Sequence, residues 1–189
     1  YGKTRLAKYD LRAGLGYAGL SFDTQRSLWL EGLQGNNNGD YNGQQFQAYI
    51  EGSRGVKLNE YSSLTPYLNL SYTQVKTDSF RESGKITALT GHTQRNHISG
   101  LTVGLQGKIH LGIRDQHQLS ANLAAYNRFG NTTPEVNLNF IGGNTYTLKG
   151  SSYSKTTALL GLGANFELKP NFNLSIAYEG EFGERMANN

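Results

Sequence analysis

A run of alternating side chains, Leu101–Leu111, constrains this chain more than any other feature. Its odd positions are apolar or glycine, and its even positions are polar or glycine. Successive side chains of a strand point to opposite faces, so this run has one apolar face and one polar face. It is also about as long as a tilted strand must be to cross a bilayer core. Several such runs, separated by turn residues, are typical of a membrane β-barrel with an apolar exterior and a polar lumen.

The composition fits one all-β domain over residues 1–189, with no second domain. The mean hydropathy is −0.54, and no stretch approaches 18 consecutive apolar residues, so a transmembrane helix is excluded. The 24 glycines and 12 tyrosines suit closely packed strands and aromatic belts at a membrane interface. The absence of cysteine excludes disulfides and thiolate chemistry. The net charge of +4 comes from scattered basic residues, which argues against nucleic acid as a partner.

The alternation predicts eight membrane spans joined by connections of alternating length. The predicted spans are Lys8–Phe22, Ser27–Gly35, Gln44–Leu58, Leu64–Lys76, His97–Leu111, His117–Phe129, Thr156–Leu168 and Phe172–Gly183. The predicted short turns are Asp23–Arg26, Asn59–Ser63, Arg114–Gln116 and Lys169–Asn171, and the long ones are Asn36–Gly43, Thr77–Asn96 and Gly130–Lys155. Short turns on one rim and long external loops on the other are typical of outer-membrane barrels.

The alternation of lengths holds only if Gly130–Lys155 is a single long external loop. This segment contains two short alternating stretches, Val136–Phe140 and Thr145–Leu148, around Ile141–Asn144. We expect them to form a hairpin that folds over or into the lumen. In the alternative interpretation, the segment contains a ninth span.

Several sequence stretches resemble the translocator barrels of autotransporters, the type V secretion system. They are Leu64–Tyr72, Thr77–Gly84, Thr133–Gly143, Tyr146–Gly150, Ala158–Gly163 and Ile176–Gly183. The resemblance covers most of the chain from about Leu11 onward, and the order and spacing of the stretches are more specific than any one of them.

The resemblance implies a twelve-stranded barrel in the bacterial outer membrane that secretes and anchors an N-terminal passenger domain. It implies no enzyme activity and no cofactor. The implied partners are outer-membrane lipid, the chain's own passenger with a linker helix in the lumen, and the barrel assembly machinery. The eight spans would match strands four to eleven, so we expect a partial barrel without the first three strands and the closing strand. In this family, passenger folding outside the cell drives secretion.

The alternation assigns side chains to the two sides of the barrel wall. The residues predicted to face the lumen are Asp10, Arg12, Gln47, Glu51, Asn69, Gln106, Lys108, His110, Arg128, Asn165, Glu167, Glu179 and Glu181. The residues predicted to face lipid are Leu68, Leu70, Leu101, Val103, Leu105, Leu162, Phe166, Leu174 and Ile176. A hydrated, charge-balanced lumen would suit the passage of an extended chain.

No catalytic or metal site is predicted. Some members of the family that this chain resembles cleave their linker with acidic lumen residues, and Glu179 and Glu181 are the candidates here. His97 and Ser99 share a strand face, but nothing completes a triad with them. The four histidines are dispersed along the chain, so hydrogen-bonded or solvated imidazoles are expected in place of metal ligands.

Three alternatives to the translocator remain at the level of the sequence. The first is a small closed eight-stranded outer-membrane barrel with a structural or adhesive role. The second is an outer-membrane channel. The third is a soluble β-sandwich or ligand-binding barrel, in which the apolar face would be the interior.

The assignment of faces predicts opposite effects for two arginine substitutions in the same strand. Val103→Arg should cost about 2–4 kcal/mol at mid-bilayer, because it places a charge in hydrocarbon. Gln106→Arg should be nearly harmless, because it adds a charge to a polar lumen. The free energy of folding into lipid vesicles measures both, and equal effects would contradict the assignment.

Overall fold

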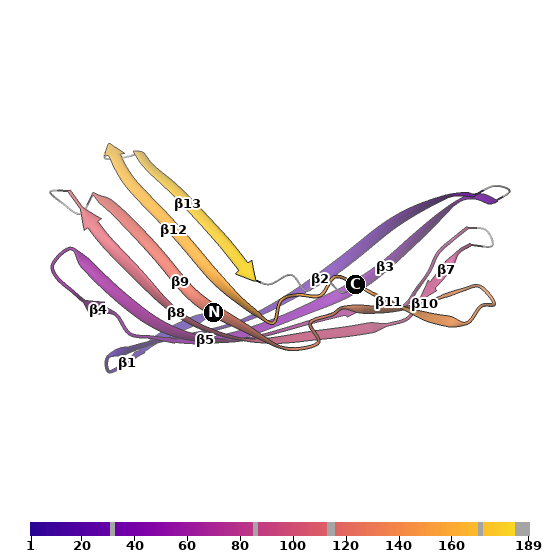
Figure 1. Cartoon of the computed structure of the whole chain (residues 1–189), viewed down its shortest axis with the longest axis horizontal. Helices are drawn as coiled ribbons and strands as arrows, with labels where there is room; N and C mark the ends of the chain where they lie inside the picture. The colour runs from indigo at the N-terminus through magenta and orange to yellow at the C-terminus, as the bar shows by residue number, and fades with distance from the viewer. Residues whose placement is uncertain (31–32, 85–86, 113–115, 170–171, 184–189) are drawn as a thin grey trace.

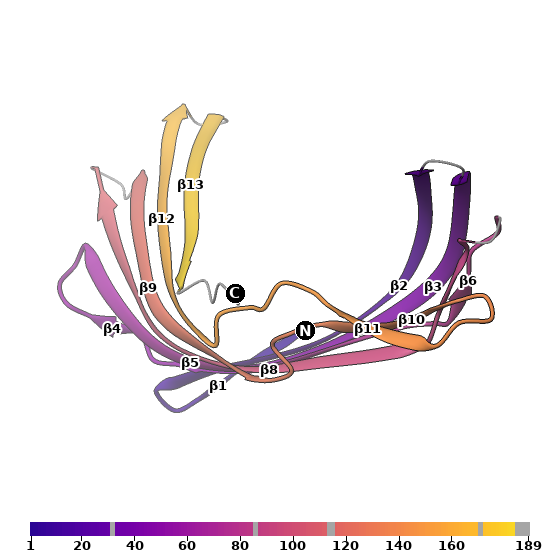
Figure 2. The same cartoon turned by 45° about the vertical axis from the view of Figure 1, so that its right-hand side comes forward.

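The computed structural model describes residues 1–30, 33–84, 87–112, 116–169 and 172–183, and its main feature is a large antiparallel sheet. The sheet curls into an open half-barrel (Figures 1 and 2). Its strands follow one another in the order β1-β2-β3-β5-β8-β9-β12-β13, and β4 pairs with β5 beside this path. The bounds are β1 Gly2–Leu6, β2 Tyr9–Leu30, β3 Leu33–Ser53, β4 Val56–Lys57, β5 Ser62–Thr77, β8 Gln94–Leu111, β9 His117–Gly130, β12 Thr156–Lys169 and β13 Phe172–Gly183. Sequential neighbours pair throughout, so every wall connection is a simple hairpin.

The register of the large sheet keeps like side chains together across strands. Leu68 of β5 lies opposite Val103 of β8, and Val103 lies opposite Ala125 of β9. One residue further along, Asn69 lies opposite Thr102. Because directly opposed residues of an antiparallel pair share a face, the alternation within each strand adds up to one apolar face and one polar face.

The apolar face of the large sheet is exposed instead of forming a core. The residues Val103 and Leu162 are 53% and 49% exposed. The total accessible surface is 13655 Å², whereas a soluble monomer of this size exposes about 9,000 Å². A soluble sandwich or ligand-binding barrel would bury this face, so the structure argues against that class. Among the described residues, no helix is long and apolar enough to cross a membrane.

The prediction of a separate span at Ser27–Gly35 is wrong, as are the turns predicted on either side of it. β2 runs through Asp23–Arg26 without a break, and β3 runs through Asn36–Gly43. The two strands pair from Asp10↔Ser53 to Leu30↔Leu33. Residues 21–30 and 33–42 lie beyond the end of β5, and we call them the distal hairpin.

Polar side chains support the distal hairpin where the sequence pattern suggests turns. The Thr24 hydroxyl donates to the Gly39 carbonyl at 2.9 Å, and the Ser21 hydroxyl donates to Asn42 Oδ1 at 3.2 Å. Turn-forming residues can therefore continue a strand here, because cross-strand contacts outweigh their intrinsic preference.

Most of the predicted connections are present, and one of each kind differs: Ala7–Lys8 is a turn that was not predicted, whereas strands run through the predicted turn Asp23–Arg26 and the predicted long connection Asn36–Gly43. The predicted turns Arg114–Gln116 and Lys169–Asn171 lie mostly outside the described residues. The described short turns are Ala7–Lys8 and Arg54–Tyr61 around β4, and the adjoining ends of β8, β9, β12 and β13 lie beside them. They gather at the left-hand end of Figure 1, which we call the short-turn rim. The far ends of β2 and β3, and the described parts of the connections from β5 to β8 and from β9 to β12, lie toward the opposite end.

A second, small sheet is built from the two long connections. It consists of β6 Phe80–Arg81, β7 Leu89–Gly91, β10 Glu135–Phe140 and β11 Thr145–Lys149, in the order β11-β10-β7-β6. The hairpin predicted within Gly130–Lys155 is thus present as β10 and β11. It pairs with β7, and the segment contributes no ninth strand to the wall. The small sheet lies beside the distal hairpin instead of entering the lumen (Figure 2).

Three tyrosines of the polar face lie over glycines of the neighbouring strand: Tyr67 over Gly104, Tyr49 over Gly14 and Tyr126 over Gly100. A methyl group added at Gly104 would lie 2.5 Å from the Tyr67 hydroxyl oxygen. Only glycine allows the ring to lie this close to the strand. These glycines therefore make room for aromatic rings in the wall.

This contact predicts that Gly104→Ala destabilises the domain by about 1–3 kcal/mol, because the methyl group displaces the Tyr67 ring. Gly16→Ala is the matched control, since its added methyl group would find its nearest neighbour, Gln47 Cβ, at 3.8 Å. The control should be neutral or stabilising by about 0.4–1 kcal/mol. Denaturant unfolding in lipid vesicles measures both, and a Gly104→Ala variant as stable as wild type would contradict the contact.

Candidate functional site

The polar face of the large sheet carries the residues predicted to line a lumen. Pairing and alternation place all of them on this one face: Asp10, Arg12, Gln47, Glu51, Asn69, Gln106, Lys108, His110, Arg128, Asn165, Glu167, Glu179 and Glu181. The opposite face carries the residues predicted to meet lipid: Leu68, Leu70, Leu101, Val103, Leu105, Leu162, Phe166, Leu174 and Ile176. What each side chain meets in a bilayer remains a prediction.

One group of polar contacts on this face joins strands β2 to β9. Arg12 Nη1 lies 3.4 Å from Glu51 Oε1, on adjacent strands. The Tyr67 hydroxyl donates a hydrogen bond to Asn122 Oδ1 at 3.0 Å and so reaches across β8. These residues border a recess of about 240 Å³ together with Gln106. The charges in this recess are balanced locally, and its amides and hydroxyls present both donors and acceptors.

A second group lies where β9, β12 and β13 approach the long connections. Arg128 donates to Glu181 Oε1 at 2.5 Å and to the Ser154 carbonyl at 3.0 Å. Its guanidinium also lies 4.4 Å from the centroid of the Tyr126 ring, within range of a cation–π interaction. Arg128 of β9 is therefore bonded both to β13 and to the end of the β9–β12 connection, next to β12.

The two groups are linked by a recess of about 490 Å³, whose polar lining includes Gln106, Asn122, Glu179 and Glu181. Gln106 and Asn122 also line the first recess, so polar side chains extend without a break across the face. Such a surface can hydrogen-bond a passing backbone, and Leu159 and Leu160 add apolar side chains to the lining of the larger recess. Glu181 is occupied by Arg128, which makes it a poor candidate for the general base of a linker cleavage.

The histidines do not converge on a site. His92 Nε2 lies 3.0 Å from Asn139 Oδ1 and helps to join β7 to β10. The His97 and His117 rings lie against Tyr72 and Phe166, with centroid distances of 6.4 Å and 5.6 Å. Within the described part of the chain, no cluster of three or more His, Asp or Glu side chains could hold a metal ion.

The sequence analysis missed a buried polar cluster that joins the small sheet to the distal hairpin. Arg26 Nη2 donates to Glu82 Oε2 at 2.6 Å and to the Thr87 carbonyl at 2.5 Å, and Asn37 Nδ2 donates to Thr87 Oγ1 at 3.0 Å. Glu82 also accepts a hydrogen bond from the Leu89 N–H at 2.8 Å. We call Arg26, Asn37, Glu82 and Thr87 the clasp. Its partners are about 50 to 60 residues apart in sequence, so no local pattern could have shown it.

An aromatic stack supports the clasp. Phe22 and Tyr41 of the distal hairpin stack at a centroid distance of 4.8 Å, and Tyr41 stacks on Phe80 of β6 at 4.5 Å. Asn38 and Ser83 exchange backbone hydrogen bonds of 3.0 Å and 2.7 Å beside it. The long connections are thus built into one structure with the hairpin.

The large sheet is curled and antiparallel, with an apolar outer face and a polar inner face. These features define the class of protein as an outer-membrane β-barrel domain. The family model named autotransporter beta-domain matches residues 1–179, and the chain belongs to this family. Autotransporter β-domains reside in the bacterial outer membrane and translocate a passenger across it. They are translocators and not catalytic domains.

Curated relatives include proteins that bear the names of enzymes. The chain is 29% identical over 167 residues to proteins named esterase EstA from Pseudomonas aeruginosa and Pseudomonas putida, covering 86% of this chain and 26% of each relative. It is 25% identical over 191 residues to an extracellular serine protease of Serratia marcescens, covering 100% of this chain and 18% of the relative. The chain therefore spans about a quarter or less of the length of these relatives.

The clasp predicts a dependence of the small sheet on pH. Burial by itself would raise the pKa of Glu82, but hydrogen bonds from Arg26 and the Leu89 N–H outweigh burial and hold this pKa below the ordinary value of 4.5. A carboxylate with a lowered pKa stabilises the folded state fully above its unfolded pKa and loses this contribution as the pH falls through its folded pKa. Limited proteolysis of the small sheet should therefore accelerate below about pH 4.

Glu82→Gln should accelerate the same proteolysis at neutral pH, with a loss of about 1.5–3 kcal/mol in local stability, because a charged hydrogen-bond acceptor is removed. Glu135→Gln is the matched control, because its carboxylate is more exposed and lies 3.6 Å from Lys149. The control should change stability by less than about 1 kcal/mol. Equal proteolysis of the two variants would contradict the role of the clasp.

Proposed function

We propose that the polar face of the large sheet lines the hydrated path along which the passenger of this autotransporter crosses the outer membrane. The strand register supports this proposal most strongly. It aligns every residue predicted to face the lumen on one face of the sheet and every residue predicted to face lipid on the other. A chain in transit needs a wall that is wet and does not retain it. The paired charges Arg12–Glu51 and Arg128–Glu181 give a polar wall with little net charge to trap either sign.

The half-barrel is proposed to be an arc of a twelve-stranded barrel. Each wall strand pairs with its sequential neighbour, and β1 and β13 pair with each other nowhere in the described residues. A small closed eight-stranded barrel would require that pairing, so the open path favours the larger barrel. Closure by further strands would satisfy the backbone groups at both edges, which lipid cannot do.

A linker segment between passenger and barrel is the proposed occupant of the lumen. The recess around Gln106 and Asn122 offers donors and acceptors at the middle of the wall, where such a segment would pass. Outer-membrane lipid is the proposed partner of the apolar face, and the barrel assembly machinery is the partner that family membership implies for insertion.

The segment Gly130–Lys155 is proposed to frame the external exit. Its hairpin pairs with β7, and the clasp ties β6 and β7 to the distal hairpin. These contacts hold the long connections beside the opening instead of across it. The passenger would then emerge next to an ordered surface of short strands.

The function can be tested with the protein that contains this chain, carrying an epitope tag in the segment that precedes Tyr1. On intact Gram-negative cells, the tag should be accessible to antibody and to added protease. A tag that stays in the periplasm while the barrel is inserted would contradict translocation.

Two tryptophan substitutions test which face lines the path. Gln106→Trp should reduce the amount of surface tag, because it places a bulky side chain in the polar recess. Leu105→Trp, one residue away on the apolar face, should leave the tag at wild-type level, because lipid accommodates the ring. A larger loss from Leu105→Trp than from Gln106→Trp would reverse the proposed orientation.

A further inference from the structure

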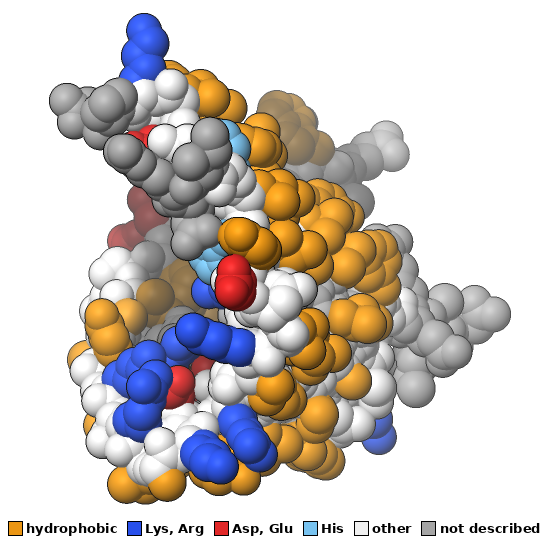
Figure 3. Space-filling model, turned by 90° about the vertical axis from the view of Figure 1, so that its left-hand side faces the viewer, with side chains coloured by type: hydrophobic (Ala, Val, Ile, Leu, Met, Phe, Trp, Pro, Cys, Tyr) orange, Lys and Arg blue, Asp and Glu red, His pale blue; other side chains and the backbone are white. Residues whose placement is uncertain are grey.

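Basic side chains gather at the short-turn rim, around the turns from β1 to β2 and from β3 to β5. Figure 3 faces this rim and shows Lys and Arg side chains grouped around a small acidic centre. Arg5, Lys8, Arg54 and Asp10 line a recess of about 320 Å³ there. Asp10 lies 3.0 Å from Arg5 and 3.9 Å from Lys3, so one carboxylate stands among four basic side chains. The recess therefore keeps a positive charge that suits an anion.

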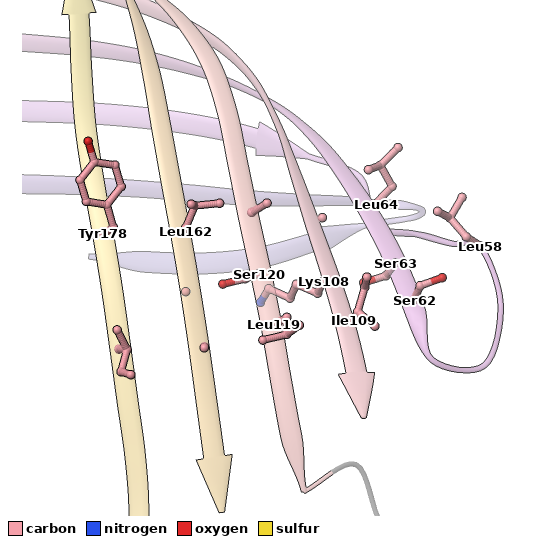
Figure 4. A pocket seen from close by; sticks show the side chains of 15 residues that line it. Leu58, Ser62, Ser63, Leu64, Lys108, Ile109, Leu119, Ser120, Leu162 and Tyr178 are labelled. Carbon is pink, nitrogen blue, oxygen red and sulfur yellow. The ribbon is translucent and has the colours of Figure 1, made fainter. Parts of the chain in front are cut away.

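An open apolar groove of about 660 Å³ lies on the apolar face near the same rim. Leu58 and Leu64 stand at one end of it and Tyr178 at the other (Figure 4). The groove is open at its centre because Gly107 of β8 and Ala121 of β9, which are direct partners across the two strands, have no side chain or a small one. Apolar side chains provide nearly the whole lining, so the groove suits a hydrocarbon chain.

The basic recess and the apolar groove are neighbours at the short-turn rim, although they share no lining residue. Val56 lines the recess and is the direct partner of Leu64, which lines the groove. The turn between them is ordered, because Asn59 Oδ1 accepts hydrogen bonds from the Tyr61 and Ser62 N–H groups at 2.9 Å and 2.7 Å. Arg54 also lies 5.9 Å from the centroid of the Tyr9 ring, so a cation and an aromatic ring meet at the rim.

We propose that the recess and the groove together form a binding site for one anionic phospholipid of the inner, phospholipid leaflet. Lys8 and Arg54 bind the phosphate, and the groove from Leu64 to Tyr178 receives an acyl chain. The inference rests on the proposed orientation, which places the short-turn rim at the periplasmic side. Basic residues beside an apolar membrane surface attract anionic headgroups, and aromatic rings at the same level mark the interface.

The headgroup half is tested by extracting the full chain from vesicles of phosphatidylethanolamine and phosphatidylglycerol and counting bound lipids by native mass spectrometry. Wild type should retain phosphatidylglycerol in preference to phosphatidylethanolamine. Lys8→Gln and Arg54→Gln should each weaken retention about fivefold, as expected for one basic residue near a membrane surface. Arg81→Gln makes the same charge change at the opposite rim and should leave retention unchanged. An equal loss in Arg81→Gln, or no loss in the rim variants, would overturn the proposal.

The acyl half is tested by filling the groove. Ala121→Phe should abolish the preferential retention, because the ring occupies the groove floor. Ala125→Phe, four residues along the same strand on the same face and outside the groove, should retain the lipid. Competition by glycerol phosphate as effective as that by the intact lipid would show a site for free phosphate and would overturn the proposal. Insertion is measured on the same samples. Wild type that inserts but shows no preference for phosphatidylglycerol would overturn this site alone, whereas failure of wild type to insert would overturn the proposed function as well.

Discussion

The pairing of each strand with its sequential neighbour, in a register that never mixes the two faces, is the constraint on which the structure depends. Hydrocarbon offers no partner for an N–H or C=O group, so a chain that crosses it must satisfy its backbone internally. The hairpins of the large sheet do this for the strands from β3 to β12, while β13 and most of β2 keep one unpaired edge in the described residues. A slip of one residue between any two strands would move charged side chains such as Glu51 or Lys108 to the apolar face. The strand register therefore determines both the backbone pairing and the separation of the apolar face from the polar face.

This constraint explains why the domain has no ordinary core. The protein itself buries little apolar surface in the described residues, and in the proposed orientation burial of the apolar face is left to the surrounding lipid. Contacts within the wall are made on the polar face instead, by tyrosine rings over glycines and by charged pairs between strands. Outside the segments proposed to cross the membrane, water can satisfy the backbone. There the clasp and the Phe22–Tyr41–Phe80 stack form a small packed cluster of polar and aromatic side chains, as in a soluble protein.

Sequence alternation predicted the wall well where strands are near the length of a membrane crossing. The expected spans His117–Phe129, Thr156–Leu168 and Phe172–Gly183 agree with β9, β12 and β13 to within one residue. The prediction failed at the distal hairpin, since Asp23 and Asn36–Asp40 are turn-forming types that here continue strands stabilised by cross-strand contacts. It missed β1, which has only five residues and one large apolar side chain. The clasp depends on contacts between remote segments, which periodicity cannot reveal.

The absence of cysteine from the chain allows the most direct test of the central claim. Single cysteines placed in turn from Leu101 to Leu111, in the protein inserted in membranes, would be labelled with a water-soluble maleimide. The account predicts that labelling alternates, with even positions reactive from the water-filled side and odd positions protected by lipid. Uniform labelling, or reactivity at the odd positions with protection at the even ones, would contradict it.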